Sequence, residues 1–470
     1  MADDRQILFR KLPAVDRLLV SPELAEALPQ YPRKLVLRAI NQVLDGLRKK
    51  IREDDVFDES DLNVESVIDL VINNLKVISR PSLRPVINAT GVVVHTNLGR
   101  SLLPERALRK FRLLSGGYSN LEYDLAKGKR GSRYTHVEGI LKELTSAEAA
   151  MVVNNNAAAV LICLETLARG REVIVSRGQL VEIGGSFRIP DVMGKSGAKM
   201  VEVGTTNKTH LRDYEEVIGP DTALLLKVHR SNFQIVGFTQ DVETSQLVAL
   251  GQKYGIPVME DLGSGCLVDF SRYGLMKEPL VQEVLTEGVD LVTFSGDKML
   301  GGPQAGIILG RKNLVDAIRK NQLSRALRID KLTLLALEET LNIYRDEEAA
   351  LREIPTLRMI TQPYKSLRTK ALRLSRMIGK LKTPNFIMDL VDSSSKVGGG
   401  ALPLLELPSR LLCLIPKGLS ASHMEEWLRS YDPPIIVRVE SDRVVLDVRT
   451  IQENELKTVA RAIKDLATTV

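Results

Sequence analysis

A lysine lies between an apolar segment and a glycine-rich turn. Lys298 follows the strand-like run Leu291–Phe294, and Met299, Leu300 and a Gly-Gly-Pro sequence come directly after it. An amine with apolar neighbours is partly desolvated, so its pKa falls and it can attack a carbonyl carbon. A lysine that forms a Schiff base with pyridoxal 5'-phosphate (PLP) needs this setting. A surface lysine with a buried stem fits the same stretch, so the choice between these two roles depends on other residues.

An aspartate occupies the equivalent place after another apolar run. Asp261 follows Ile256–Glu260 and precedes a Gly-Ser-Gly turn. In an open α/β sheet, ligands bind beyond the carboxyl ends of the strands, where Asp261 and Lys298 would both lie. A carboxylate beside the pyridine nitrogen keeps that nitrogen protonated, and PLP then acts as an electron sink. The alternative for Asp261 is a helix cap or a turn residue.

An asparagine-rich turn supplies the third element of a cofactor site. Met151–Val153 has the pattern of a strand, and a helix is expected to begin in the alanines that follow the turn. The free N–H groups and the dipole at the start of a helix favour a phosphate group. The residues expected to contact the cofactor here are Asn154, Asn155, Asn156 and Ala157. An ordinary capped turn is the alternative.

The composition is that of an ordinary globular protein with several domains. The chain has 470 residues, of which 44% are hydrophobic and 26% are charged, and this length predicts two to three domains. Aromatic residues make up only 4%, which argues against a platform on which nucleic-acid bases stack. The net charge of +6 is a mild excess that suits a polyanionic partner without requiring one.

Cysteine usage and hydropathy predict a cytoplasmic protein. Cys163, Cys266 and Cys413 are far apart and do not have the spacing of a zinc site, so no metal is expected. Unpaired cysteines fit a reducing cytoplasm. We find no signal peptide and no apolar run long enough to span a bilayer, so no membrane partner is expected.

The first 76 residues are expected to form a helical domain. Val36, Ile40, Leu44, Leu47 and Ile51 recur at helical spacing. The same segment carries a cluster of cations: Arg33, Lys34, Arg38, Arg48, Lys49, Lys50 and Arg52. Such a cluster either forms a solvated helix face or contacts the phosphates of a nucleic acid.

The rest of the chain divides into two further predicted domains. From 77 to 345, short apolar runs alternate with helical patterns, which is typical of a parallel sheet with helices on both faces. A long helix is expected from Lys331 to about Leu351. From 346 to 470 we expect a smaller α+β domain, with a helix cap at Ser422 and a flexible loop at Ser393–Gly400.

These features resemble a known class of enzymes. A large parallel-sheet domain with Asp261 and Lys298 at this spacing, followed by a small α+β domain, resembles the fold-type I (aspartate aminotransferase-like) PLP enzymes. Several motifs are similar to those of the bacterial selenocysteine synthase family, the L-seryl-tRNA(Sec) selenium transferases: Arg84–Gly91, His95–Arg100, Gly117–Asp124, Gly128–Arg133, Glu182–Asp191 and Ser295–Lys298. Leu12–Leu19 resembles the start of that family's tRNA-binding domain.

The resemblance implies a reaction and a partner. Lys298 would carry PLP and move the α-proton of a seryl group attached to tRNA(Sec). The β-hydroxyl would leave to give dehydroalanyl-tRNA, and selenium from selenophosphate would add. Selenophosphate requires permanently charged, planar donors, which Arg100, Arg325 and Arg328 would supply. The three-residue spacing of Arg325 and Arg328 predicts that they share one helix face. The implied assembly is a homodecamer of five dimers.

Four further residues are weaker candidates for cofactor contacts. They are Gln179, His229, Ser264 and Ser295, each of which has a structural role as its alternative. A second function also remains open, namely a PLP-dependent lyase or aminotransferase that acts on a small amino acid or amino sugar. The helical N-terminal segment and the lack of an obvious arginine clamp for a free carboxylate disfavour it.

Overall fold

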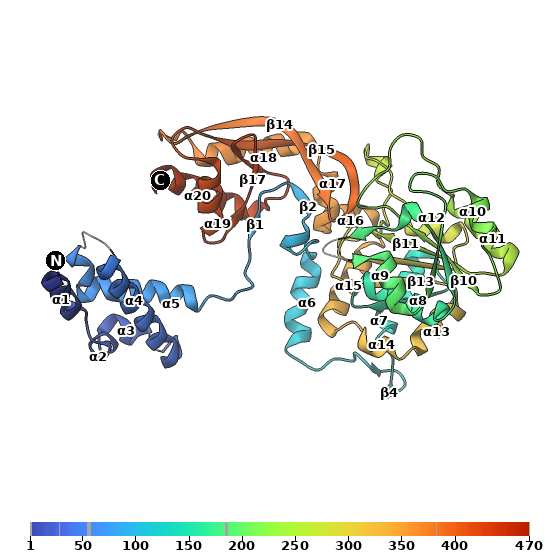
Figure 1. The fold of residues 1–470 in the computed structure, drawn as a ribbon, viewed down its shortest axis with the longest axis horizontal. Coiled ribbons are helices and arrows are strands. Elements are labelled where there is room, and N and C mark those ends of the chain that lie inside the picture. Colours follow the sequence, from blue (N-terminus) through green and yellow to red (C-terminus); the bar gives the residue numbers. More distant parts are fainter. Residues whose placement is uncertain (1, 28, 54–57, 184–186, 382, 470) are drawn as a thin grey trace. The chain divides into compact units, whose positions relative to one another are not determined.

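The chain forms two units, Met1–Pro85 and Val86–Val470 (Figure 1). The computed structural model describes residues 2–27, 29–53, 58–183, 187–381 and 383–469. Each unit has its own hydrophobic core.

The first unit is helical, as its sequence predicts. It contains α1 (Ala2–Lys11), α2 (Val15–Leu19), α3 (Pro22–Ala27), α4 (Arg33–Glu53), the short 3-10 helix η1 (Glu59–Leu62) and α5 (Val64–Ile78). The apolar residues at helical spacing in α4 are buried, and they pack against the apolar face of α5. The opposite face of α4 therefore presents its charged residues to solvent.

The second unit is built on a seven-stranded sheet. In spatial order its strands are β5 (Ala149–Val153), β13 (Gly306–Gly310), β12 (Leu291–Ser295), β11 (Val258–Gly263), β10 (Thr222–Val228), β6 (Glu172–Ser176) and β9 (Lys199–Val203). All neighbouring strands are parallel except β13, which runs antiparallel to both β12 and β5. The mostly parallel sheet predicted from the sequence is confirmed.

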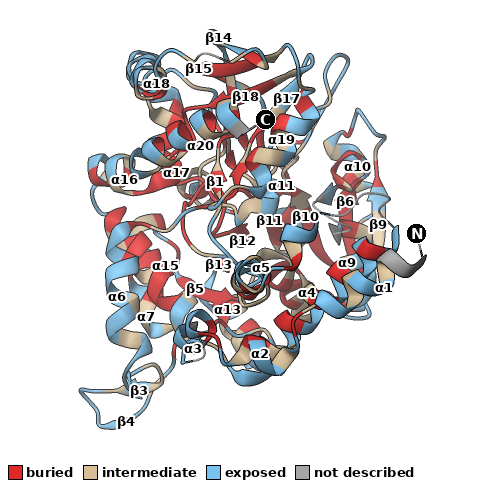
Figure 2. Ribbon diagram, turned by 90° about the vertical axis from the view of Figure 1, so that its left-hand side faces the viewer, coloured by how far each residue is buried: buried red, intermediate tan, exposed pale blue. Residues whose placement is uncertain are grey.

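Helices cover both faces of this sheet, so its strands are buried on both sides (Figure 2). One face packs against α8 (Asn156–Ala168), α9 (Ile189–Ser196) and α13 (Lys312–Lys320). The other face packs against α7 (Thr135–Thr145), α11 (Thr244–Tyr254), α12 (Val281–Thr286) and α15 (Lys331–Ile343). A sheet enclosed in this way leaves only its ends open to a ligand.

The C-terminal part of this unit has a second, mainly antiparallel sheet. Its order is β17 (Arg438–Glu440), β18 (Arg443–Asp447), β15 (Ala401–Pro416), β14 (Phe386–Gly398) and β2 (Val92–Val94). One layer of helices packs on it: α18 (Tyr364–Ile378), α19 (Ala421–Ser430) and α20 (Leu456–Thr469). The short strands β1 (Ile87–Asn88) and β16 (Ile435–Ile436) pair separately. The predicted α+β composition is confirmed.

Three local predictions were wrong. Ser393–Gly398 belongs to β14 because the segment pairs antiparallel with β15, and the Ser395 hydroxyl also donates to buried Asp447 at 2.7 Å. The predicted long helix ends at Ile343, and α16 (Glu347–Glu353) begins after Asp346, whose carboxylate accepts a hydrogen bond from the Ala349 N–H. The cap of α19 is Ser420, whereas Ser422 lies inside the helix.

Candidate active site

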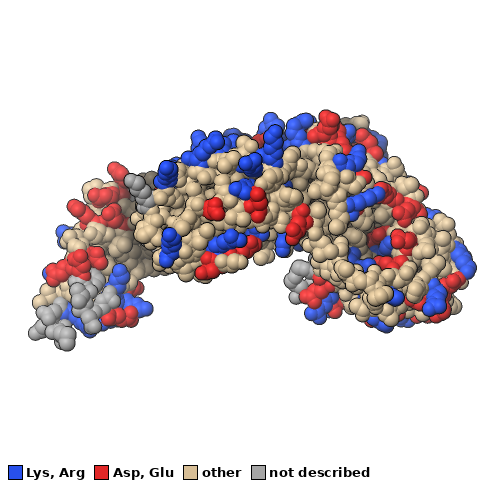
Figure 3. Space-filling model, turned by 90° about the horizontal axis from the view of Figure 1, so that it is seen from above, with Lys and Arg blue, Asp and Glu red and all other residues tan. Residues whose placement is uncertain are grey.

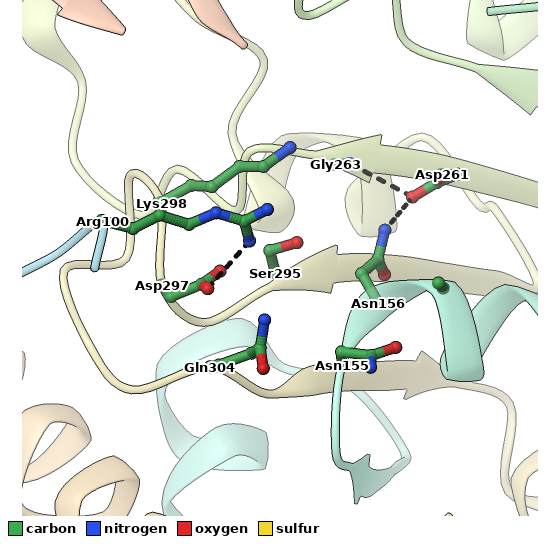
Figure 4. Close-up of a pocket in the computed structure, with 10 residues that line it drawn as sticks. Arg100, Asn155, Asn156, Asp261, Gly263, Ser295, Asp297, Lys298 and Gln304 are labelled. Atoms are coloured by element: carbon green, nitrogen blue, oxygen red, sulfur yellow. Dashed lines mark hydrogen bonds and ion pairs between the residues drawn. The ribbon is translucent and has the colours of Figure 1, made fainter. Parts of the chain in front are cut away.

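A cavity of about 200 Å³ opens where several strands of the large sheet end (Figure 4). It lies beyond the carboxyl ends of β11 and β12, beside the turn from β5 into α8. This is where an open α/β sheet binds ligands. Its lining residues are Arg100, Asn155, Asn156, Ala157, Asp261, Gly263, Ser295, Asp297, Lys298 and Gln304. The structure therefore brings together seven of the residues selected from the sequence.

Lys298 reaches this cavity from the turn that follows β12. Only 4% of the residue is exposed, and no described residue forms a hydrogen bond or ion pair with its amine. Burial lowers the pKa of Lys298, and the nearby Asp261 carboxylate opposes that shift. A lowered pKa leaves more of the amine neutral, and the neutral amine is the form that attacks a carbonyl or accepts a proton.

The backbone around Lys298 is fixed by several hydrogen bonds. The Ser101 hydroxyl donates to the carbonyl oxygens of Asp297 and Lys298, at 2.8 and 2.9 Å. The Tyr344 hydroxyl donates to the Leu300 carbonyl at 2.8 Å. These contacts come from distant parts of the chain, and they hold the turn so that the amine enters the cavity.

The Asp261 carboxylate has one satisfied oxygen and one that remains available. Its Oδ1 atom accepts from Asn156 Nδ2 at 2.8 Å, from Thr293 Oγ1 at 3.1 Å and from the Gly263 N–H at 3.2 Å. Among the described residues, none donates to Oδ2. The register of β11 shifts between Asp261 and Gly263, an irregularity that redirects this strand end. A protonated ring nitrogen of PLP fits the free Oδ2 atom.

Burial raises the pKa of Asp261, while its three donors and Lys298 favour the ionised form. A cationic partner at Oδ2 would stabilise the charge of this carboxylate further.

The start of α8 provides a site for a phosphate group. Asn155 is the cap, and its Oδ1 atom accepts from the Ala158 N–H at 2.8 Å. The N–H groups of Asn156 and Ala157, in the first turn, have no partner within the helix. The Ser295 hydroxyl lines the same cavity, so these donors fit the phosphate of PLP.

Close packing of the backbone shapes this end of the cavity. Gly306, the first residue of β13, lies against the turn that precedes α8. A Cβ atom at Gly306 would lie 2.1 Å from the Asn155 carbonyl oxygen. A larger residue would therefore displace the cap and the N–H groups that follow it.

An ion pair holds Arg100 at the cavity. Arg100 Nη1 lies 2.8 Å from Asp297 Oδ2. Arg100 also has a φ angle of +62°, in the left-handed region that is costly for a residue with a Cβ atom. We did not assign a role to Asp297 from the sequence, although a charged residue directly before Lys298 in an apolar turn was a usable signal. Gln304 was also missed.

The remaining cofactor candidates lie around the cavity without lining it. The Ser264 hydroxyl donates to Glu278 at 2.8 Å, and His229 Nδ1 lies 3.9 Å from the same carboxylate. Burial lowers the pKa of His229 to about 4, so its ring is neutral near pH 7. The Gln179 amide accepts from the Val228 N–H and donates to Asp241, so both of its polar atoms are engaged. Asn154 lines a different pocket on α8.

Arg325 and Arg328 do not share a helix face, so that prediction was wrong. The helix α14 (Leu323–Ala326) is only four residues long and ends before Arg328. Both residues are exposed, and neither lines the cavity of its own chain. Arg328 lies 3.6 Å from Glu122 and forms a backbone bridge with Val153, at the end of β5.

The predicted nucleic-acid contacts all lie on one helix. The seven cations from Arg33 to Arg52 are exposed residues of α4. Arg48 pairs with Asp45 at 2.7 Å, and Lys49 lies 3.9 Å from Glu53. The other five form no ion pair with a described residue.

Comparisons with known proteins agree with this geometry. Residues 86–452 match the family model described as L-seryl-tRNA selenium transferase, and residues 9–48 match the one described as selenocysteine synthase N terminal. The L-seryl-tRNA(Sec) selenium transferase of Geobacter sulfurreducens is 52% identical over 98% of this chain and 99% of its own length. The enzyme of that name from Moorella thermoacetica is 53% identical, over 97% and 96%.

A solved structure also supports the fold. The structure of D-glucosaminate-6-phosphate ammonia-lyase has a TM-score of 0.54 and 20% identity, and it covers 82% of this chain and 96% of that one. The fold is that of the fold-type I, aspartate aminotransferase-like enzymes, and the cofactor is PLP. With a family model that spans most of its length and relatives that are half identical over nearly all of it, this chain belongs to the L-seryl-tRNA selenium transferase family.

Proposed function

We propose that this protein converts L-seryl-tRNA(Sec) to L-selenocysteinyl-tRNA(Sec), with selenophosphate as the selenium donor. The observation that carries the proposal is the cavity that joins Lys298, Asp261 and the start of α8, in a chain of this family. In the reaction, the β-hydroxyl of the seryl group leaves as water, selenium from selenophosphate takes its place, and cleavage of the P–Se bond by water releases phosphate.

Each residue of the cavity has its own role in this reaction. Lys298 holds the cofactor and then moves the α-proton of the seryl group, which its lowered pKa favours. When bound, PLP supplies an electron sink for the charge that develops at the α-carbon. Asp261 would hold the ring nitrogen, while Ser295 and the first N–H groups of α8 would hold the phosphate. The substrate carboxyl is esterified to tRNA, so no arginine clamp for a free carboxylate is required.

Selenophosphate is assigned to arginines. Arg100 lies in the cavity with its guanidinium fixed by Asp297, and it offers further N–H donors to an anion. Arg325 and Arg328 do not line the cavity of their own chain. We therefore assign them to the cavity of a neighbouring copy in a homo-oligomer, for which the decamer of five dimers is our proposal.

Oligomer formation is expected to be required for activity. A neighbouring copy would complete each site with Arg325 and Arg328, so an isolated copy would lack two of its three anion-binding arginines. Light scattering of the active protein should give a mass many times that of one 52.1 kDa chain. A fully active monomer would contradict both the assembly and the assignment of these arginines.

The helical unit is proposed to bind the tRNA. Removal of residues 1–76 should leave PLP binding unchanged, because every residue of the cavity belongs to the other unit. The same truncation should weaken tRNA binding about 100-fold or more, because it removes the cations of α4. Binding of tRNA to the full-length and truncated proteins at one salt concentration measures the effect. Equal affinities would assign tRNA recognition to the catalytic unit instead.

The choice between this function and a small-molecule lyase or aminotransferase depends on the substrate. Consumption of serine should be rapid when it is attached to tRNA(Sec) and negligible for free L-serine at equal concentration. Comparable rates would favour the small-molecule function.

None of the described helices is long and apolar enough to cross a membrane. The three free thiols fit our proposal of a cytoplasmic enzyme, which cell fractionation would test.

A further inference from the structure

Two C-terminal helices carry a large excess of positive charge. Together, α18 and α20 contain eight Lys and Arg residues and one acidic residue, an excess of seven charges, whereas the whole chain has a net charge of +6. Residues 1–85 contain 14 basic and 14 acidic residues, so the helical unit has no net charge. α4 alone has seven basic and two acidic residues, an excess of five, so α18 and α20 form a second strongly basic part of the chain that can attract a polyanion.

The cations on these helices are exposed and mostly unpaired. Three lie on α18 (Lys365, Arg368 and Arg376) and three on α20 (Lys457, Arg461 and Lys464). Within the described parts of the chain, none of these six side chains forms an ion pair or a hydrogen bond. The single acidic residue of the two helices, Asp465, accepts a hydrogen bond from the Tyr431 hydroxyl at 2.7 Å. We call these six residues the C-terminal basic stripe.

Packing places both halves of the stripe in one helical layer. The two helices contact each other, and their apolar faces share a core with the inner face of the C-terminal sheet. Arg373, in the middle of α18, pairs with Glu453 just before α20 begins. The cations therefore point away from the sheet. Figure 3 shows Lys and Arg side chains along one edge of the surface in that view, with Asp and Glu side chains elsewhere on the same face.

Spacing along the helices suits a charged polymer better than a single small anion. Lys365 and Arg376 are 11 residues apart, which is about 16 Å along a helix. Tyr364, at the first position of α18, is the one aromatic residue on these two helices. Contacts without base stacking read the backbone and the shape of an RNA, not its sequence.

Another basic helix of the chain has exposed leucines beside its arginines. α6 (Glu105–Ser115) also carries several arginines, but it exposes Leu108 and Leu113, with relative exposures of 47% and 77%. Exposed leucines beside arginines are typical of a contact between proteins. On α18 and α20, the cations have few such apolar neighbours, which favours a polyanion as the partner.

We propose that the C-terminal basic stripe binds the phosphate backbone of the tRNA substrate and carries a substantial part of the salt dependence of tRNA affinity. The proposal rests on the proposed function and adds a second contact surface to the one assigned to α4. The stripe should bind tRNA(Sec) and other tRNAs equally well, because phosphates carry no sequence information. Selection of tRNA(Sec) would then depend on the helical unit.

Charge-neutralising variants of the full-length protein test this. One variant carries Lys365→Gln, Arg368→Gln and Arg376→Gln, and a second carries Lys457→Gln, Arg461→Gln and Lys464→Gln. The control carries Lys142→Gln, Lys199→Gln and Lys320→Gln, which removes three exposed cations from the catalytic unit. Unchanged PLP absorbance and light scattering would show that each variant is folded and assembled.

The measured quantity is the slope of log affinity against log salt concentration. It is determined for tRNA(Sec) and for a serine tRNA, each without an attached amino acid. Each stripe variant should make the slope less steep by about 2 to 3, because each phosphate contact contributes about 0.7 to 0.9 to its magnitude. The affinity for both tRNAs should fall about 10- to 100-fold near 0.1 M salt. The control should change neither.

Two results would overturn the proposal. Slopes equal to those of the control would assign the stripe to a different partner, such as an acidic protein. Loss of affinity for tRNA(Sec) alone would mean that the stripe reads features specific to that tRNA. The proposed function fails separately: a wild-type protein that binds tRNA with a steep salt slope but does not transfer selenium would leave the stripe intact as an RNA-binding surface.

Discussion

Replacement of Lys298 by alanine should abolish selenium transfer, with a loss of about 10⁴-fold or more. The variant loses the amine that holds the cofactor and the base that moves the α-proton, and each role alone contributes about 10²- to 10⁴-fold. The fold should persist, because no described residue depends on the Lys298 amine for a hydrogen bond. Turnover of seryl-tRNA(Sec) and the near-visible absorbance of lysine-bound PLP measure the two effects.

Lys227→Ala is a matched control for this variant. Lys227 is a half-buried lysine on β10 that donates to the Thr244 hydroxyl at 2.6 Å, outside the cavity. It should retain the absorbance and most of the activity. A Lys298→Ala protein that still converts seryl-tRNA at a rate near that of the wild type would show that another residue holds the cofactor.

Replacement of Asp261 by asparagine is expected to lower activity about 10²- to 10³-fold while the protein remains folded. The amide oxygen of asparagine can accept the three hydrogen bonds that Oδ1 now accepts. At the position of Oδ2, however, the amide presents N–H donors, which cannot stabilise a protonated ring nitrogen. The electron sink is therefore weakened, and the absorbance of bound PLP should shift.

Glu260→Gln provides the comparison on the same strand. Glu260 is also buried, but its carboxylate accepts from the Thr244 hydroxyl at 2.9 Å and does not line the cavity. This variant should keep its activity near that of the wild type. If the two variants lost activity equally, the effect would come from the disturbance of β11, and Asp261 would have no special relation to the cofactor.

The sequence predicted the parts of the site that follow directly from strand ends. Asp261, Ser295 and Lys298 each come at or shortly after an apolar strand, and the asparagines come directly after β5. Because the carboxyl ends of parallel strands meet at one edge, their spacing in the chain is enough to bring them together.

Other features depend on contacts that local patterns do not contain. Arg100 meets Asp297 across 197 positions of the chain, and Glu278 meets Ser264 from a loop without a recognisable motif. Ser393–Gly398 has the composition of a loop, but it pairs with β15, and Ser395 contacts Asp447 and Arg449, more than 50 positions away. Arg325 and Arg328 have helical spacing, yet α14 ends between them.

The central claim is that this chain replaces the hydroxyl of a tRNA-bound serine with selenium at the Lys298 site. The most direct test is to incubate the purified protein with seryl-tRNA(Sec) and selenophosphate, with PLP present or removed, and to identify the amino acid on the tRNA by mass spectrometry. We predict selenocysteine on the tRNA only when selenophosphate and PLP are both present. Serine that remains unchanged on the tRNA in the complete reaction would contradict the account.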